Sequence, residues 1–96
     1  MTLLPFDYDF DPKLKGIFEK LLKKDPHRAE IIYKKVKQIT NSDETTIGHY
    51  KNLRHDLSDR KRVHIDKSFV LTFSFDKKRK FILFIDFDHH DNIYKK

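Results

Sequence analysis

The residue types best suited to chemistry lie near the end of the chain, where an apolar run becomes polar. His89 and His90 follow this run, and Tyr94 comes four residues after the second histidine. Histidine titrates near neutral pH, and a tyrosine hydroxyl can donate or accept in a hydrogen bond. A strand that only fills a core needs none of these groups. His90 and Tyr94 are therefore predicted to belong to a catalytic or binding site.

A second group of candidates lies in a basic segment before the predicted sheet. Residues 49–64 contain three arginines, two lysines and three histidines beside a tyrosine. Cations next to an aromatic ring suit the backbone and bases of a nucleic acid, although a solvated loop can have the same composition. The residues predicted to bind nucleic acid are Lys51, Arg54, His55 and Lys61 of this segment, together with His89 of the tail.

A metal site made of His89, His90 and Asp91 is disfavoured. Adjacent residues of a strand point to opposite faces, so they chelate poorly unless the backbone turns. Asp86 and Asp88 share a face with His90, and these carboxylates are expected to pair with a basic side chain. The sequence also has no glycine-rich phosphate loop and no serine-nucleophile motif. No metal and no cofactor are predicted.

The composition indicates one domain, spanning residues 1–96, with a modest core. Nine Phe and four Tyr offset a charged fraction of 38%, which favours a folded chain over a disordered one. The net charge of +6 favours a polyanionic partner such as nucleic acid or the ribosome. The absence of cysteine excludes thiolate chemistry. No apolar run is long enough to span a membrane, and no signal peptide is recognised, so a cytoplasmic location is predicted.

Two helices are predicted to position the sheet. Asp11-Pro12 and Asp25-Pro26 both combine an N-cap residue with a proline at the first helical position. The second helix is expected to end at residues 41–43. The two apolar stripes, at spacings of three and four, are Leu14, Ile17, Phe18, Leu21 and Leu22, and then Ala29, Ile32, Val36 and Ile39. The very short join predicts an antiparallel helix hairpin.

Three strands are predicted at about residues 61–66, 68–76 and 80–88, joined by short turns as an antiparallel meander. Residues 42–58 are expected to form a loop or an irregular lead-in. Residues 3–10 are expected to form an edge strand or an extended arm. The predicted fold is α+β, with an N-terminal helix hairpin packed on one face of a small, mainly antiparallel, twisted sheet of 3–4 strands.

Strand alternation divides the side chains between two faces. The face covered by the helices is predicted to hold Val63, Ile65, Phe69, Leu71, Phe73, Phe75, Phe81, Leu83, Ile85 and Phe87. The opposite face is predicted to hold Arg62, His64, Val70, Thr72, Ser74, Ile82, Phe84, Asp86, Asp88 and His90. This second face mixes an apolar floor with cationic, hydroxyl, carboxylate and imidazole groups, which is typical of a ligand site as well as of a solvated sheet. His89 is expected on the covered side, away from His90.

The order and spacing of several short motifs resemble the RelE/ParE toxin superfamily. Two helices precede the segment 51–53, which reads Lys-Asn-Leu. A strand with Arg62 and His64 follows, and the closing strand ends with His90 and Tyr94. Within this superfamily the chain is most similar to the RelE-type mRNA interferases of type II toxin–antitoxin systems, and the similarity extends over nearly the whole chain.

The resemblance implies a ribosome-dependent endoribonuclease that inhibits translation. In such toxins the 2′-hydroxyl of the RNA attacks the neighbouring phosphate without a metal ion. The implied partners are the ribosome with its mRNA and a cognate antitoxin, expected to be small and acidic or amphipathic.

The resemblance also assigns roles to four residues. His90 is expected to act as general acid or base, with Tyr94 as its partner or as a platform on which a base stacks. Arg62 is expected to bind the phosphate, and His64 is the second candidate for proton transfer.

One position departs from the family pattern. Many members carry an arginine on the next strand, where this chain has Val70, and a tyrosine where this chain has Phe73. If that arginine normally stabilises the transition state, Lys67 or Arg62 would have to replace it.

Two alternatives remain open on the sequence alone. A ParE-like inhibitor of DNA gyrase would share the fold without needing a titratable pair on the sheet. A non-catalytic RNA- or protein-binding member would be consistent with the missing arginine.

Overall fold

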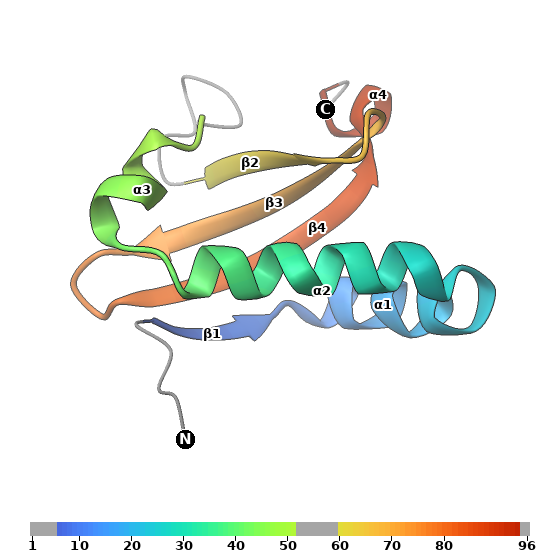
Figure 1. Ribbon diagram of the computed structural model, residues 1–96, viewed down its shortest axis with the longest axis horizontal. Helices are drawn as coiled ribbons and strands as arrows, with labels where there is room; N and C mark the ends of the chain where they lie inside the picture. Colours follow the sequence, from blue (N-terminus) through green and yellow to red (C-terminus); the bar gives the residue numbers. More distant parts are fainter. Residues whose placement is uncertain (1–5, 52–59, 95–96) are drawn as a thin grey trace.

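The computed structural model describes residues 6–51 and 60–94, apart from the side chain of Tyr94. Four strands form one sheet in the order β1-β4-β3-β2 (Figure 1). β1 runs parallel to β4, and the other neighbours are antiparallel. The elements are β1 (Asp7–Phe10), α1 (Pro12–Lys24), α2 (Pro26–Thr40), α3 (Glu44–His49), β2 (Arg60–Ile65), β3 (Phe69–Asp76), β4 (Phe81–His89) and α4 (His90–Tyr94). The predicted α+β fold with a mainly antiparallel sheet is confirmed.

The two Asp-Pro pairs start the helix hairpin as predicted. The side chain of Asp11 accepts a hydrogen bond from the Lys13 N–H, and that of Asp25 accepts one from the Arg28 N–H. The Asp25 N–H also donates to the carbonyl of Leu21, so one residue ends α1 and begins α2. None of the helices within the described residues is long and apolar enough to cross a membrane.

Two short helices lie where the sequence predicted none. α3 falls inside the segment expected to be a loop, and it begins where the Asp43 side chain accepts a hydrogen bond from the Thr46 N–H. This capping bond lowers the pKa of the Asp43 carboxyl. α4 begins directly after β4, so the tail turns away from the sheet instead of extending it.

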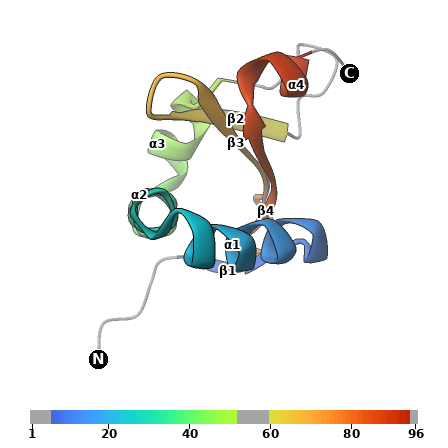
Figure 2. The same ribbon diagram turned by 90° about the vertical axis from the view of Figure 1, so that its right-hand side faces the viewer.

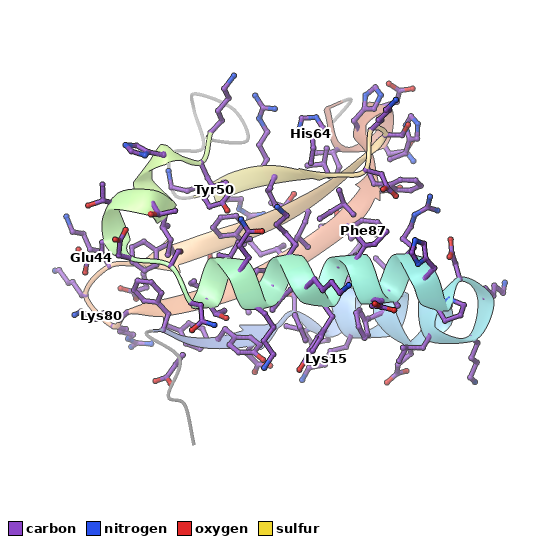
Figure 3. All side chains as sticks on the ribbon, viewed as in Figure 1. Lys15, Glu44, Tyr50, His64, Lys80 and Phe87 are labelled. Carbon is purple, nitrogen blue, oxygen red and sulfur yellow. The ribbon has the colours of Figure 1, made fainter. Side chains whose placement is uncertain are left out.

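The main core lies between the sheet and the helices α2 and α3, which cover one side of it. Figure 2 shows α2 and α3 on this side and α4 on the other. Phe87 lies between β4 and α2 (Figure 3). The buried members of this core are Phe6, Leu14, Ile32, Val36, Ile39, Ile47, Ile65, Leu71, Phe73, Ile82, Phe84 and Phe87.

A β-bulge at Ile85 changes which residues of β4 face this core. Thr72 pairs with Asp86, but the next residue of β3, Phe73, pairs with Phe84, so Ile85 has no partner. An extra residue on one strand shifts its alternation by one position. Phe87 therefore faces the core on one side of the bulge, and Phe84 faces it on the other.

The predicted alternation of β4 was wrong on the N-terminal side of this bulge. Phe81, Leu83 and Ile85 were expected in the core, but each is half-buried, and none belongs to the main core cluster. Ile82 and Phe84 were expected on the opposite face, and both are fully buried in the core. The other predicted core positions on β2, β3 and β4 lie in the core or pack against it.

The opposite face of the sheet, called the α4 face below, is not a bare surface. It carries Val70 and Thr72, which are 0% and 2% exposed, beside the edge residues Arg62 and His64. α4 contacts β3 and β4, and its Ile93 is buried outside the main core. The apolar floor predicted for this face is therefore partly covered.

The turn between β3 and β4 holds Lys80 in a left-handed conformation, with φ of 53°. This conformation costs an L-residue with a Cβ atom roughly 1–2 kcal/mol, whereas glycine adopts it freely. Lys80→Gly is therefore expected to raise the free energy of unfolding by up to about 1 kcal/mol, after the extra chain entropy of glycine is subtracted. Urea denaturation of the purified protein measures this change.

Lys78→Gly is the matched control, because Lys78 lies in the same turn and is not among the described residues with positive φ. This control should be neutral or destabilising. Equal stabilisation by both substitutions would contradict the explanation.

Candidate active site

The two histidines of the tail lie at the junction of β4 and α4. β4 ends at His89 and α4 begins at His90, whose backbone N–H donates to the carbonyl of Ser68 at 2.8 Å. The two imidazole rings stack, with centroids 4.6 Å apart and planes inclined by 27°. Strand alternation had predicted that these rings point to opposite faces. That prediction was wrong, because the backbone turns into a helix at this point.

Asp91 lies against both rings. Its carboxylate oxygens are 3.6 Å from Nδ1 of His89 and 3.0 Å from Nδ1 of His90. The Asp91 N–H also donates to Nδ1 of His89 at 3.2 Å, which places the proton of a neutral His89 ring on Nε2. The two histidine side chains are 39% and 41% exposed, so solvent and a ligand can reach them.

Asp88 stabilises the junction of β4 and α4 through hydrogen bonds. One carboxylate oxygen of Asp88 accepts from the His89 N–H at 2.7 Å and from the side-chain amide of Asn92 at 3.0 Å. A hydrogen bond across the turn thus ties the first turn of α4 to the last residues of β4. The side chains of this turn are held by local bonds that the sequence alone did not reveal.

Phe69 supports His89 from the core side of the sheet. The two rings meet edge to face with centroids 5.7 Å apart, and Phe69 also stacks on Phe87 at 5.1 Å. The guanidinium of Arg28 lies over the Phe69 ring, 4.4 Å from its centroid. His89 therefore contacts Phe69 on the covered side, as alternation predicted, but His90 stacks on it at the end of the sheet instead of lying on the opposite face.

Arg28 links distant parts of the chain beneath this stack. Its guanidinium is 3.2 Å from a carboxylate oxygen of Asp25 and 3.7 Å from one of Asp66, in the turn between β2 and β3. No pattern in the sequence signals this contact, because it joins α2 to a turn formed almost forty residues later. Arg28 is a supporting residue that the sequence analysis missed.

Arg62 and His64 lie on β2, the outer strand of the sheet. His64 pairs with Val70, which pairs with Asp88, and Arg62 pairs with Thr72, which pairs with Asp86. Paired strands are about 4.8 Å apart, so the backbones of β2 and β4 are separated by roughly 10 Å.

His64 is exposed near the end of the sheet where α4 lies (Figure 3). His90 contacts Ser68, His89 and Asp91 at the far side of β3 from these two residues. Arg62 and His64 thus lie on one side of β3, and the end of β4, where His90 follows, lies on the other.

Val70, at the position of the family arginine, is fully buried between these two sides. The valine side chain carries no charge and has no exposed surface, so it offers nothing to a bound phosphate. A positive charge for a bound phosphate must therefore come from a neighbouring position, and Arg62 and Lys67 are the described candidates proposed from the sequence. Asp86 is paired with Lys13 at 3.2 Å, as expected for this carboxylate.

The predicted RNA-binding residues lie in part along the outer edge of β2. The carbonyl of Lys51 accepts from the Arg62 N–H at 2.9 Å, and the ammonium of Lys61 donates to the carbonyl of Tyr50 at 3.2 Å. Tyr50 packs edge to face on Phe73, and burial raises the pKa of its hydroxyl, so this tyrosine is structural.

Three predicted site features lie outside the described residues. These are Arg54, His55 and the side chain of Tyr94, whose backbone forms the last residue of α4. The segment 52–53 of the family-like motif and residues 3–5 of the predicted edge strand also lie outside. The described part of that strand, β1, is an edge strand as predicted.

Similar proteins occur in two archaea. The chain is 52% identical over 91 residues to a protein of Methanocaldococcus jannaschii named "Putative toxin RelE4", and the alignment covers 95% of this chain and 93% of that protein. It is 44% identical over 82 residues to an "Uncharacterized protein" of Methanosarcina mazei, covering 85% of this chain and 91% of the relative. No protein-family model matches the chain. The high identity over nearly the full length of both chains shows that this protein belongs to the RelE family of toxins.

Proposed function

We propose that this protein is the toxin of a type II toxin–antitoxin system and cleaves mRNA on the ribosome. The observation that carries the proposal is the position of His90. It is a half-exposed imidazole, fixed where β4 becomes α4, at the end of a sheet whose outer strand presents Arg62 and His64. Membership of the RelE family and the basic net charge support the same reading.

The proposed reaction needs no group from outside the RNA and the protein. The 2′-oxygen attacks the adjacent phosphorus and loses its proton to a general base, while the 5′-oxygen leaves and takes a proton from a general acid. The products are a 2′,3′-cyclic phosphate and a 5′-hydroxyl end. His90 and His64 are the candidates for the two proton transfers, and each can serve because imidazole titrates near neutral pH.

Arg62 is the proposed cation for the charge that develops on the phosphate. Arg62 in β2 pairs with the buried Thr72 in β3. It lies two residues before His64 and on the same face of the strand. A guanidinium offers two parallel donors to phosphate oxygens, which suits the trigonal-bipyramidal transition state. With Val70 buried, Arg62 would take over the role of the family arginine.

The remaining basic residues are proposed to hold the RNA strand. Lys51 and Lys61 lie beside β2, and Arg54, His55 and His89 complete the proposed set. These contacts would be largely electrostatic, so binding should weaken steeply as salt is raised. Tyr94 is proposed to assist His90 or to stack on a base.

The proposed partner in the resting cell is a small antitoxin. A protein with a net charge of +6 is best neutralised by an acidic segment, and a disordered one can wrap a large surface when it folds on binding.

Cleavage of an mRNA on translating ribosomes tests the proposed function. The purified protein should cut the message only when ribosomes are present, and the new ends should carry a cyclic phosphate and a 5′-hydroxyl. Inhibition of DNA gyrase with intact translation would instead support the ParE-like reading. RNA binding without any cleavage would support the non-catalytic reading.

A further inference from the structure

We propose that His89, His90 and Asp91 form a binding site for a transition-metal ion such as Zn²⁺, and that occupation of this site inhibits RNA cleavage. The three residues each offer one ligand atom, and these atoms all lie within 4.8 Å of one another. The inhibition rests on the proposed function, whereas metal binding stands independently of it.

The turn at the end of β4 is what makes these residues a chelate. Three consecutive residues of a strand would point alternately to opposite faces, which was the reason for disfavouring a metal. The chain instead leaves β4 at His89 and enters α4 at His90, and the two imidazoles stack on one side. The carboxylate of Asp91 then reaches both rings.

The distances suit a tetrahedral ion. With bonds of about 2.0–2.2 Å, neighbouring ligand atoms of a tetrahedral zinc site are roughly 3.3–3.6 Å apart. Oδ2 of Asp91 is 3.6 Å from Nδ1 of His89, and Oδ1 of Asp91 is 3.0 Å from Nδ1 of His90, so each imidazole has a carboxylate oxygen near this spacing. An ion lies in the plane of each imidazole that binds it, so the two stacked rings would have to turn toward each other to bring all three atoms onto one ion. The hydrogen bond from the Asp91 N–H to Nδ1 of His89 would be exchanged for the metal bond.

The backbone around the three ligands is already fixed. The His90 N–H is bonded to the Ser68 carbonyl, and Asp88 accepts from both the His89 N–H and the Asn92 amide. Phe69 meets the His89 ring edge to face. Such supporting contacts orient metal ligands and lower the entropy lost on binding.

The ligand set selects the class of ion. Two imidazole nitrogens and one carboxylate suit Zn²⁺, Ni²⁺ or Cu²⁺, whereas Mg²⁺ and Ca²⁺ prefer sites made of oxygen atoms. The site is partly open to solvent, so one position on the ion would remain for water.

A metal ion at this place would block the proposed chemistry. The ion would occupy Nδ1 of His90 and hold the ring against Asp91, so the imidazole could not turn toward the RNA.

Isothermal titration of the full chain with Zn²⁺ alone tests the site. One ion should bind per chain, and Mg²⁺ should give no comparable heat. Asp91→Asn leaves both imidazoles in place and is expected to weaken Zn²⁺ binding by at least about tenfold. Replacing both histidines should abolish it. His27→Ala is the matched control, because His27 is exposed on α2 and is not one of the three ligands, and it should bind as wild type does.

Unchanged Zn²⁺ affinity in Asp91→Asn and in the double histidine variant, or no saturable binding at all, would overturn the metal site. Inhibition is then measured in the ribosome assay by adding Zn²⁺ to wild type and to Asp91→Asn. Wild type should be inhibited at a Zn²⁺ concentration at least about tenfold lower than the variant, and a zinc-selective chelator should restore activity.

The two proposals fail in different ways. If Zn²⁺ binds at these residues but wild type does not cleave mRNA without it, the proposed function fails and the metal site stands. If wild type cleaves and Zn²⁺ neither binds nor inhibits, the metal site fails alone.

Discussion

Replacing His90 with alanine is expected to lower the rate of ribosome-dependent mRNA cleavage by about 10²–10⁴-fold, the usual contribution of one positioned proton-transfer group. The substitution removes the imidazole but not the backbone bond from the His90 N–H to Ser68, so the junction of β4 and α4 should persist. Single-turnover cleavage of an mRNA on stalled ribosomes, in buffer free of transition metals, measures the change.

The pH profile separates a chemical role of His90 from a structural one. Wild type should lose activity on at least one side of neutrality as an imidazole titrates, and His90→Ala should lose that dependence. A variant that folds, binds ribosomes and keeps the wild-type rate and pH profile would remove His90 from the mechanism. His27→Ala again serves as the control. The His27 ring is exposed on α2, and its removal is expected to leave the cleavage rate unchanged.

His64→Ala, made in parallel, assigns the second proton transfer. If His64 and His90 serve as the base and the acid of one reaction, their removal should flatten opposite limbs of the pH profile. A full loss for one histidine and no effect for the other would leave the second proton transfer to Tyr94 or to water.

The helix hairpin could be predicted from the sequence because its signals are local. Asp11 and Asp25 cap the helices through bonds to residues two and three positions ahead, and the apolar stripes need only the helical period. The strands could be located for the same reason. Features that depend on contacts between distant segments could not be predicted in this way.

In the candidate site, too, local features could be predicted and contacts between distant segments could not. The sequence identified His90, Arg62 and His64 by residue type and by resemblance to a family. It did not predict the stacking of His89 on His90, because the start of α4 depends on the bond to Ser68 across the sheet. Arg28 was missed because its role comes from Phe69 and Asp66, which are remote in the sequence.

The second large effect is expected at Phe84, whose position in the core depends on the β-bulge at Ile85. Residues 81–85 are all apolar, so either alternation gives an apolar face, and the sequence holds no signal for the bulge. The pairing of β4 with β3 determines which of these residues face the core. Phe84 pairs with Phe73 and is fully buried. Phe84→Ala should therefore lower the free energy of unfolding by about 3–5 kcal/mol.

Phe81→Ala tests the bulge itself, because it makes the same substitution three residues earlier in the same strand. Phe81 is half-buried and does not pack on the main core, so its loss should cost less than half as much. Domains of this size have a total stability of about 5–15 kcal/mol, so Phe84→Ala could fail to fold. Phe84→Leu and Phe81→Leu then provide a milder pair for urea denaturation. A larger effect at Phe81 in either pair would mean that β4 follows simple alternation. The bulge would then be absent in solution.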